Sequence, residues 1–295
     1  MIMRRILLLT FLLIFKSASS YAQDFKFGDF SSEQESHFAG PRFEVGYSTG
    51  KFIGIDRDYA EFGVFLPLST AGEWVPFLDA RGYRFEDSQW GSSAGIGLRA
   101  PLNDGSIFGV NAYYDYLEGD FNHGFHRGGA GFEWLGSCLD VRMNGYFPFS
   151  SRIHHSKPRV CTYPGGYILE CRRNEFRVGD GFDAEVGLPL LNFCDFTIYG
   201  AMGPYYYHFP RHQNFWGGQW RLEINWRSYL SVRVNTSYDG RYHSRTQVQA
   251  LVSVPLTVLF GNSSLTDYCN DLITQPVRRN GIIFTDRCCF CTQNW

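Results

Sequence analysis

Apolar and polar residues alternate one by one in about a dozen short segments of the chain. In LSVRVNTSY, Leu230, Val232 and Val234 share one face of an extended strand, whereas Ser231 and Arg233 fall on the other. This alternation indicates strands that have an apolar phase on one side only. We predict twelve of them: Arg42–Thr49, Asp58–Pro67, Trp74–Arg84, Ser92–Pro101, Ile107–Tyr116, His126–Trp134, Cys138–Pro148, Phe182–Pro189, Asp195–Tyr205, Gly217–Trp226, Tyr229–Tyr238 and Thr246–Pro255.

The lengths of the connections between these strands alternate as well. Connections after even-numbered strands are short, as at 135–137 and 227–228, whereas 149–181 and 206–216 are long. Bacterial outer-membrane barrels have an even number of strands, short periplasmic turns and longer outside loops. We therefore predict an all-β fold, a twelve-stranded antiparallel transmembrane β-barrel of the bacterial outer membrane.

The first residues carry the features of a secretory signal. Arg4 and Arg5 precede the apolar run Ile6–Phe15, and Ser20-Tyr21-Ala22 resembles a cleavage site. The run is too short to span a bilayer as a helix. We expect a signal peptide at 1–22, a short periplasmic segment at 23–41, the barrel at 42–256, and a linker with a cysteine-rich tail at 257–295.

Composition agrees with a barrel wall and argues against a nucleic-acid partner. The formal net charge is −2, and three of the basic residues leave with the signal peptide. Aromatic residues make up 18% of the chain although its mean hydropathy is only −0.23. A wall that is apolar outside and polar inside, with aromatic residues at both interfaces, explains this combination.

The faces opposite the apolar ones carry charges of both signs. We expect these side chains to form a network of paired charges in the lumen rather than a pore lined by one sign. They are Glu44, Glu61, Asp79, Arg81, Arg99, Asp115, Arg127, Glu133, Asp140, Arg142, Asp183, Glu185, Arg221, Glu223 and Arg233.

Several motifs carry a resemblance to a known family. They are GVNAYYDY at Gly109–Tyr116, HRGGAGFEW at His126–Trp134, NGYFPFS at Asn144–Ser150, GFDAEVGLPL at Gly181–Leu190 and PVRRNGIIF at Pro276–Phe284. Together and in this order they resemble the β-domain of the intimin/invasin family, the inverse autotransporters. The resemblance covers residues 42–284.

The resemblance implies that a linker after the last strand re-enters the lumen and carries a passenger to the cell surface. Outer-membrane lipid and the barrel-assembly machinery are then the expected partners. Because the sequence stops at Trp295, we expect an anchoring and translocation barrel without a passenger. Arg278 and Arg279 would lie among wall carboxylates such as Glu185 and Glu223. The linker motif is Pro276, Val277, Arg278, Arg279 and Asn280.

Eight cysteines are unusual for such a barrel. In an oxidising compartment, Cys161 and Cys171 of the longest outside loop form a candidate disulfide. Cys288, Cys289 and Cys291 are candidates for cross-links to other envelope proteins. A metal site or an internal disulfide in this tail stays open, although its spacing lacks the C-x₂-C pattern of zinc sites.

No nucleophile stands beside a base in a recognisable spacing, so we expect no enzyme, no catalytic or metal-binding residue and no cofactor. Three functions are left open. The first is a passenger-less inverse autotransporter barrel with its C-terminal segment in the lumen. The others are a porin-like channel and a surface adhesin that acts through its own outside loops.

Overall fold

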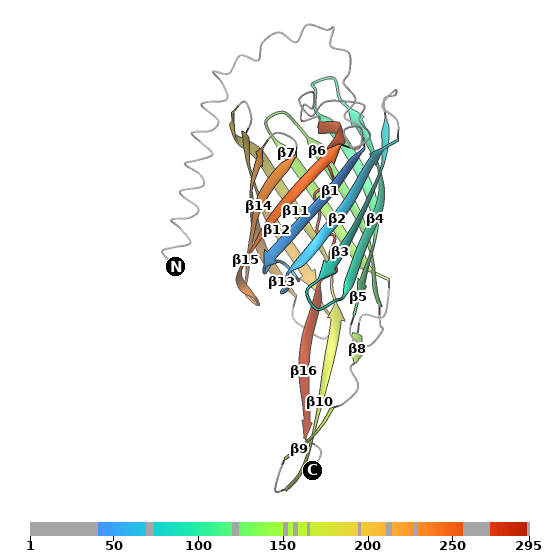
Figure 1. The fold of residues 1–295 in the computed structure, drawn as a ribbon, viewed down its shortest axis with the longest axis vertical. Helices are drawn as coiled ribbons and strands as arrows, with labels where there is room; N and C mark the ends of the chain where they lie inside the picture. The colour runs from blue at the N-terminus through green and yellow to red at the C-terminus, as the bar shows by residue number, and fades with distance from the viewer. Residues whose placement is uncertain are drawn as a thin grey trace. The chain divides into compact units, whose positions relative to one another are not determined.

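Antiparallel strands close into a barrel in the computed structural model of this protein (Figure 1). It describes residues 41–68, 74–119, 124–149, 153–155, 159–163, 166–193, 196–210, 214–226, 229–255 and 272–293. The twelve barrel strands of this part of the chain are β1 (Arg42–Gly50), β2 (Tyr59–Pro67), β3 (Val75–Phe85), β4 (Trp90–Pro101), β5 (Ile107–Glu118), β6 (Gly124–Leu135), β7 (Asp140–Pro148), β11 (Asp180–Asn192), β12 (Phe196–His208), β13 (Phe215–Trp226), β14 (Leu230–Asp239) and β15 (His243–Pro255). The predicted closed, twelve-stranded barrel is confirmed.

The first and last barrel strands pair with each other and close the wall. The register runs from Arg42 opposite Pro255 to Gly50 opposite Gln247. All other neighbours are consecutive along the chain except β7 and β11, which pair directly although β8 to β10 lie between them in sequence. We call the end with the β4–β5 and β6–β7 turns the short-turn end, drawn at the top of Figure 1, and the opposite end the long-loop end.

Burial alternates along the strands as the sequence pattern predicts. In β1, Glu44 is 6% exposed, whereas the next outward residues, Val45 and Tyr47, are 47% and 54% exposed. Outward-facing tryptophans such as Trp74 near the short-turn end and Trp90 near the long-loop end match the aromatic girdles of membrane barrels. The apolar outer surface is therefore built for lipid.

A charge on this outer surface should be costly. Val234 faces outward in β14, opposite Leu222 and Val248. We expect Val234→Arg to lower the free energy of unfolding by about 2–4 kcal/mol, the cost of a charge near the bilayer midplane. Ser231→Arg, on the inward face of the same strand, is the control and should cost far less. Urea titrations in lipid vesicles check this, and equal losses would contradict the assigned faces.

A second sheet extends the molecule beyond the long-loop end (Figure 1). It consists of β8 (Ile153–His155), β9 (Arg159–Tyr163), β10 (Gly166–Val178) and β16 (Thr285–Gln293). The central strand β10 pairs with β8 and β9 along one edge and with β16 along the other. The interpretation of 149–181 as a loop was therefore wrong over most of its length. These strands escaped prediction because no membrane lies against one face to impose alternation.

The chain between the barrel and β16 begins, where described, with the 3₁₀ helix η3 (Leu272–Thr274). No helix in the described ranges is long and apolar enough to cross a membrane. The expected signal peptide, residues 23–40 and residues 256–271 lie outside the described residues.

Candidate functional site

The segment 272–284, here called the linker, runs through the lumen from the short-turn end to the long-loop end. Wall arginines from three strands donate hydrogen bonds to its main-chain carbonyl groups. Because these bonds go to backbone oxygens, they hold the linker in place along its length whatever its side chains. The pairs are Arg99 to Ile273 at 2.6 Å, Arg81 to Val277 at 2.8 Å and Arg127 to Asn280 at 2.6 Å.

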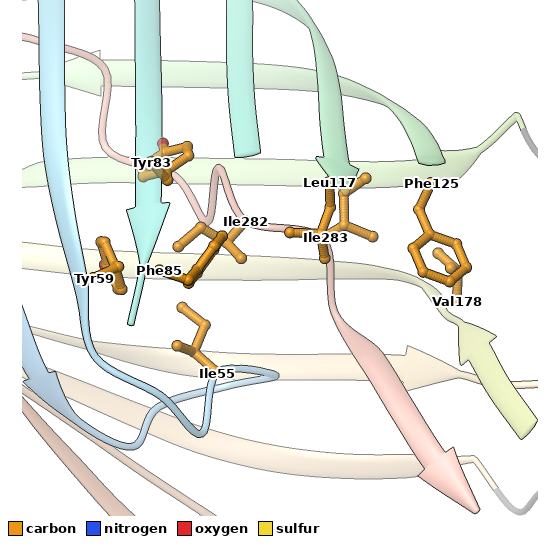
Figure 2. Close-up of a cluster of buried hydrophobic side chains, with 9 residues drawn as sticks. All are labelled: Ile55, Tyr59, Tyr83, Phe85, Leu117, Phe125, Val178, Ile282 and Ile283. Atoms are coloured by element: carbon orange, nitrogen blue, oxygen red, sulfur yellow. The ribbon is translucent and has the colours of Figure 1, made fainter. Parts of the chain in front are cut away.

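The end of the linker is embedded in apolar side chains at the long-loop end. Figure 2 shows Ile282 and Ile283 among buried side chains of strands β2, β3, β5, β6 and β10 and of the loop after β1. Phe284, 2% exposed, packs on Tyr207 and Phe209 with ring centroids 4.9 and 5.0 Å apart. We call this layer around Ile282, Ile283 and Phe284 the apolar seal.

The loop between β1 and β2 folds over the seal. Ile53 and Ile55, on either side of Gly54, are buried at 4% and 5% exposure. Gly54 has φ +71°, and a Cβ atom there would lie 2.4 Å from the Phe284 ring. Only glycine satisfies both conditions. Sequence reasoning missed the seal, although the apolar residues in KFIGI and in NGIIF were a usable signal.

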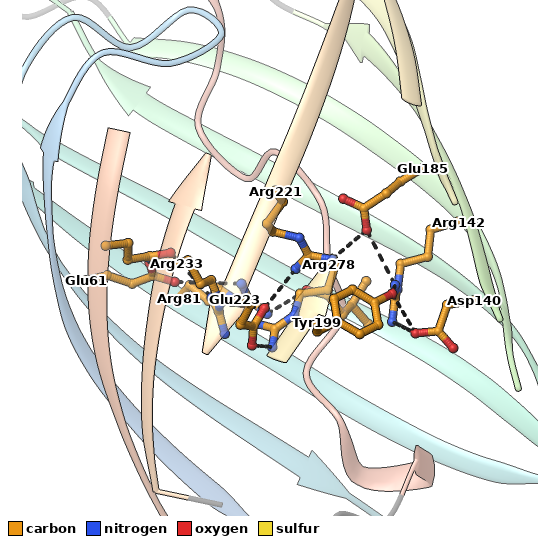
Figure 3. Close-up of polar contacts among 12 residues, drawn as sticks. Glu61, Arg81, Asp140, Arg142, Glu185, Tyr199, Arg221, Glu223, Arg233 and Arg278 are labelled. Carbon is orange, nitrogen blue, oxygen red and sulfur yellow. Dashed lines mark hydrogen bonds and ion pairs between the residues drawn. The ribbon is translucent and has the colours of Figure 1, made fainter. Parts of the chain in front are cut away.

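Arg278 joins a group of charges in the middle of the lumen (Figure 3). Its Nη2 lies 3.0 Å from Oε1 of Glu223. Oε2 of the same carboxylate lies 3.1 Å from Nη1 of Arg221 and 3.0 Å from Nε of Arg233. One buried carboxylate thus forms ion pairs with three guanidinium groups, one from the linker and two from the neighbouring wall strands β13 and β14.

Arg279 enters a separate and more enclosed site, which we call the Asp115 clamp. Its Nη1 and Nη2 donate to the two carboxylate oxygens of Asp115 at 2.8 and 2.6 Å, and Nη1 also donates to Oγ of Ser93 at 2.8 Å. The guanidinium carbon lies 4.2 Å from the Tyr113 ring centroid. The planar fork of arginine therefore meets a carboxylate and an aromatic face together.

The opposite side of the Asp115 clamp is formed by Arg127, whose Nε and Nη2 donate to Asp115 Oδ2 at 2.9 and 2.7 Å. The side chains of Arg127 and Asp115 are both fully buried. Gly129 leaves the room that Arg279 needs, because a Cβ at this position would lie 2.6 Å from Nη2 of Arg279.

The expected neighbours of the two linker arginines are met in part. Arg278 pairs with Glu223, but Arg279 pairs with Asp115 rather than with Glu185. Glu185 lies 2.6 Å from Arg221 and 3.4 Å from Arg142 instead. The inward face of a residue follows from alternation, whereas its partner depends on the register and on the path of the linker.

The remaining wall charges of the predicted network also face the lumen. Arg99 pairs with Glu133 at 2.7 Å and Arg142 with Asp140 at 3.0 Å. Arg81 lies 3.0 Å from Asp79 and 3.7 Å from Glu61. Asp183 accepts hydrogen bonds from Asn144 and from the Tyr146 hydroxyl, and Glu44 is buried.

Counted over the described barrel strands, carboxylates outnumber arginines on the inward face. The ten carboxylates are Glu44, Glu61, Asp79, Asp115, Glu133, Asp140, Asp183, Glu185, Glu223 and Asp239. The eight arginines are Arg42, Arg81, Arg99, Arg127, Arg142, Arg221, Arg233 and Arg245.

Two cavities lie beside the linker. One of about 130 Å³ reaches toward the long-loop end, and one of about 290 Å³ toward the short-turn end. Arg221, Arg233 and Arg278 line both, so the group around Glu223 separates them.

The cysteines take different positions. Cys138, in the β6–β7 turn at the short-turn end, is free and exposed. The register sets Cys161 opposite Glu170 and Cys171 opposite Val160, on adjacent rungs of β9 and β10. Their side chains, and those of Cys288, Cys289 and Cys291 in β16, lie outside the described residues. The disulfide therefore stays a prediction. Among the described side chains, no group of three or more His, Cys, Asp or Glu could hold a metal ion.

A closed barrel with an apolar outer surface and a lumen occupied by its own chain defines an outer-membrane β-barrel protein. The model of the family "inverse autotransporter, beta-domain" matches residues 42–194, more than half of the chain. The chain therefore belongs to the inverse autotransporter β-domain family, as the resemblance in its motifs predicted. It is a protein of the bacterial outer membrane, where its outer surface meets lipid.

One solved structure supports this fold. It comes from work on the in-meso crystallization of membrane proteins and is 15% identical, with a TM-score of 0.56 over 83% of this chain and 99% of that chain. An outer-membrane channel from Pseudomonas putida F1 is 9% identical, with a TM-score of 0.49 over 78% and 100%. The β-domain of the Bordetella autotransporter Brka is 10% identical, with a TM-score of 0.37 over 73% and 99%.

At such identities the likeness concerns the fold alone. No curated protein sequence matches the chain. The family match gives no better support to a porin-like channel or an adhesin than to the anchoring and translocation function.

Proposed function

We propose that the barrel anchors the chain in the outer membrane and carries its own C-terminal segment from the periplasmic side to the cell exterior. The observation that supports this most directly is the path of the linker. It passes from η3 through the lumen and continues as β16, which pairs with β10 beyond the long-loop end. If the short turns are periplasmic, as in bacterial barrels generally, β16 lies outside the cell.

The proposal includes an organisation of the whole chain. Residues 1–22 serve as a signal peptide, 23–41 as a short periplasmic segment, 42–256 as the barrel, and 257–295 as the linker and tail. The barrel-assembly machinery inserts the barrel, and the wall charges serve as the network that holds the linker.

The tail cysteines are proposed to link the chain to other envelope proteins. The strand TDRCCFCTQ that contains them pairs along one edge only, with β10, in the described sheet. In an oxidising environment, thiols on an exposed edge strand are open to exchange with a partner's disulfide. A disulfide between Cys161 and Cys171 would brace the β9–β10 hairpin next to this strand.

Labelling of single cysteines in whole cells tests the direction of transport. Two variants keep only Cys289 or only Cys138, with all other cysteines replaced by serine. A membrane-impermeant maleimide should label Cys289 in intact cells, because β16 is outside. It should label Cys138 only after the outer membrane is permeabilised, because the exposed β6–β7 turn is periplasmic.

Protection of Cys289 in intact cells, together with labelling after permeabilisation, would contradict the proposal and leave the tail in the periplasm. Current recordings in planar bilayers then address the porin-like alternative. A plugged lumen predicts a closed wild-type barrel, whereas a steady open current would favour a channel.

A further inference from the structure

We propose that the lumen wall is a recognition site for an extended segment with two consecutive arginines. This inference rests on the proposed function and specifies what the barrel accepts as its lumen segment. It is carried by three observations: the charge balance of the wall, the two different arginine sites, and a wall carboxylate close to Arg279 that forms no ion pair.

The first observation is that the wall is short of two positive charges. Ten carboxylates and eight arginines face the lumen from the described barrel strands. Arg278 and Arg279 are the charged residues of the linker, and together they bring the described lumen to neutrality. Arg241 and Asp286, at the long-loop mouth, pair with each other at 2.6 Å and leave this balance unchanged. Because buried charges are costly unless compensated, the wall favours a segment that supplies two cations.

The second observation is that the two sites differ and fix the order of the segment. The first arginine meets a carboxylate that two wall arginines already share, beside two cavities that leave space for water. The second is 3% exposed in the Asp115 clamp and stacks on an aromatic ring. Lysine carries the same charge but lacks the planar fork with which Arg279 binds both carboxylate oxygens of Asp115.

The residue after the arginine pair is restricted as well. The side chain of Asn280 donates to the main-chain carbonyl of Ile53 at 3.4 Å and accepts from the main-chain N–H of Ile282 at 3.3 Å. At Gly281 a Cβ atom would lie 2.4 Å from the hydroxyl oxygen of Tyr83. The accepted segment is therefore two arginines, a polar residue and a glycine, followed by the apolar residues of the seal.

The third observation is Asp183, which, like Glu44 and Asp239, has no arginine within ion-pair distance among the described residues. Its carboxylate accepts hydrogen bonds from Asn144 at 2.9 Å and from Tyr146 at 2.6 Å. The Tyr146 ring centroid lies 5.6 Å from the guanidinium carbon of Arg279, so Asp183 belongs to the same part of the lumen. Of the three unpaired carboxylates, Asp183 is the one that Tyr146 links to Arg279, so it is the part of the negative surplus that Arg279 balances through space.

A charge-balance cycle in the full chain tests the proposal. Arg279→Gln, Asp183→Asn and the double variant are compared with wild type in planar bilayers, where release of the linker appears as channel openings. Arg279→Gln should raise the open fraction roughly a hundredfold, because it breaks a buried charge pair. The openings should be cation-selective, because the wall then keeps its negative surplus.

The informative result is the direction in which Asp183→Asn changes the open fraction in each of the two backgrounds. In wild type, Asp183→Asn should raise the open fraction, because it leaves a surplus positive charge. In Arg279→Gln, the same substitution should lower the open fraction, because it removes the unbalanced negative charge. A purely structural role of Asp183 predicts an increase in both backgrounds, and that result would overturn the proposal. So would an Arg279→Gln variant that opens no more than wild type.

Two controls complete the design. Arg279→Lys keeps the positive charge, so its channel openings should not become cation-selective. It should still open more often than wild type, because lysine lacks the planar fork of arginine. If Arg279→Gln does not fold, the cycle is repeated with Arg278→Gln, whose side chain lines the same cavity as Asp183. Labelling of Cys289 in the variant that keeps only this cysteine separates this inference from the proposed function. If the tail is labelled but the effects of the two substitutions simply add, only the charge matching is contradicted.

Discussion

Asp115→Asn is expected to lower the free energy of unfolding of the barrel by about 3–5 kcal/mol, the cost of removing one partner from a buried ion pair. The Asp115 carboxylate is fully buried and accepts hydrogen bonds from Arg127 and Arg279. Asparagine keeps the volume of the side chain but removes its charge. Two buried guanidinium groups then lose their compensating anion at the same time.

Urea-induced unfolding in lipid vesicles, followed by tryptophan fluorescence, measures this loss. Ser93→Ala is the matched control, because Ser93 donates a hydrogen bond to the same carboxylate at 2.7 Å and accepts one from Arg279 at 2.8 Å but carries no charge. Its cost should be smaller, about 1.5–3 kcal/mol, the net value of hydrogen bonding to charged groups. Comparable losses in the two variants would show that the charge of Asp115 is not what holds the clamp.

Phe284→Ala is expected to weaken docking of the linker end by about 3–5 kcal/mol, the usual range for truncating a buried phenylalanine. Phe284 contacts rings of both β12 and the loop after it, and it covers Gly54. The substitution leaves a void in the apolar seal and removes several aromatic contacts.

Hydrogen exchange of the main-chain amides at 281–284 measures docking directly, and these amides should exchange much faster in the variant. Phe149→Ala provides the control, since Phe149 is 70% exposed just beyond β7. It should leave exchange in the linker unchanged. If linker exchange stayed slow in Phe284→Ala, the polar contacts of the linker alone would suffice to hold its end.

The barrel could be predicted from the sequence because the membrane imposes a strict rule on each strand. All twelve segments, the inward face of residues such as Glu223 and the use of the lumen by PVRRNGIIF follow from alternation or from the family motifs. Each predicted strand differs from the observed one by only a few residues at its ends. Because lipid contacts one side of every strand, apolar residues recur at every second position, and this alternation can be recognised in the sequence.

The partners of the wall charges could not be predicted in the same way. Alternation assigns Asp115 and Glu185 to the same inward surface, but it does not say which one Arg279 reaches. That choice depends on the register between strands and on the position of Arg279 along the barrel axis. Gly129, which makes room for Arg279, looks in sequence like any other glycine of a barrel wall.

The second sheet was missed for the opposite reason. GYILECRRNEFRV and TDRCCFCTQ have polar and charged residues on both faces of the strand. What joins them is main-chain pairing between segments more than a hundred residues apart, and such pairing leaves little trace in side-chain pattern.

The pairing of β16 with β10 has a mechanical consequence. Strand β10 continues through Gly179 into β11 of the wall, so it is fixed to the barrel at its C-terminal end. A force that pulls the tail away from the barrel acts on the far end of β16, along the strand axis. It loads all nine residue pairs between Thr285 and Gln293 at once, in shear, instead of opening them one after another. The tail is thus attached in the geometry that resists extension best, with the load shared between the sheet and the linker inside the barrel.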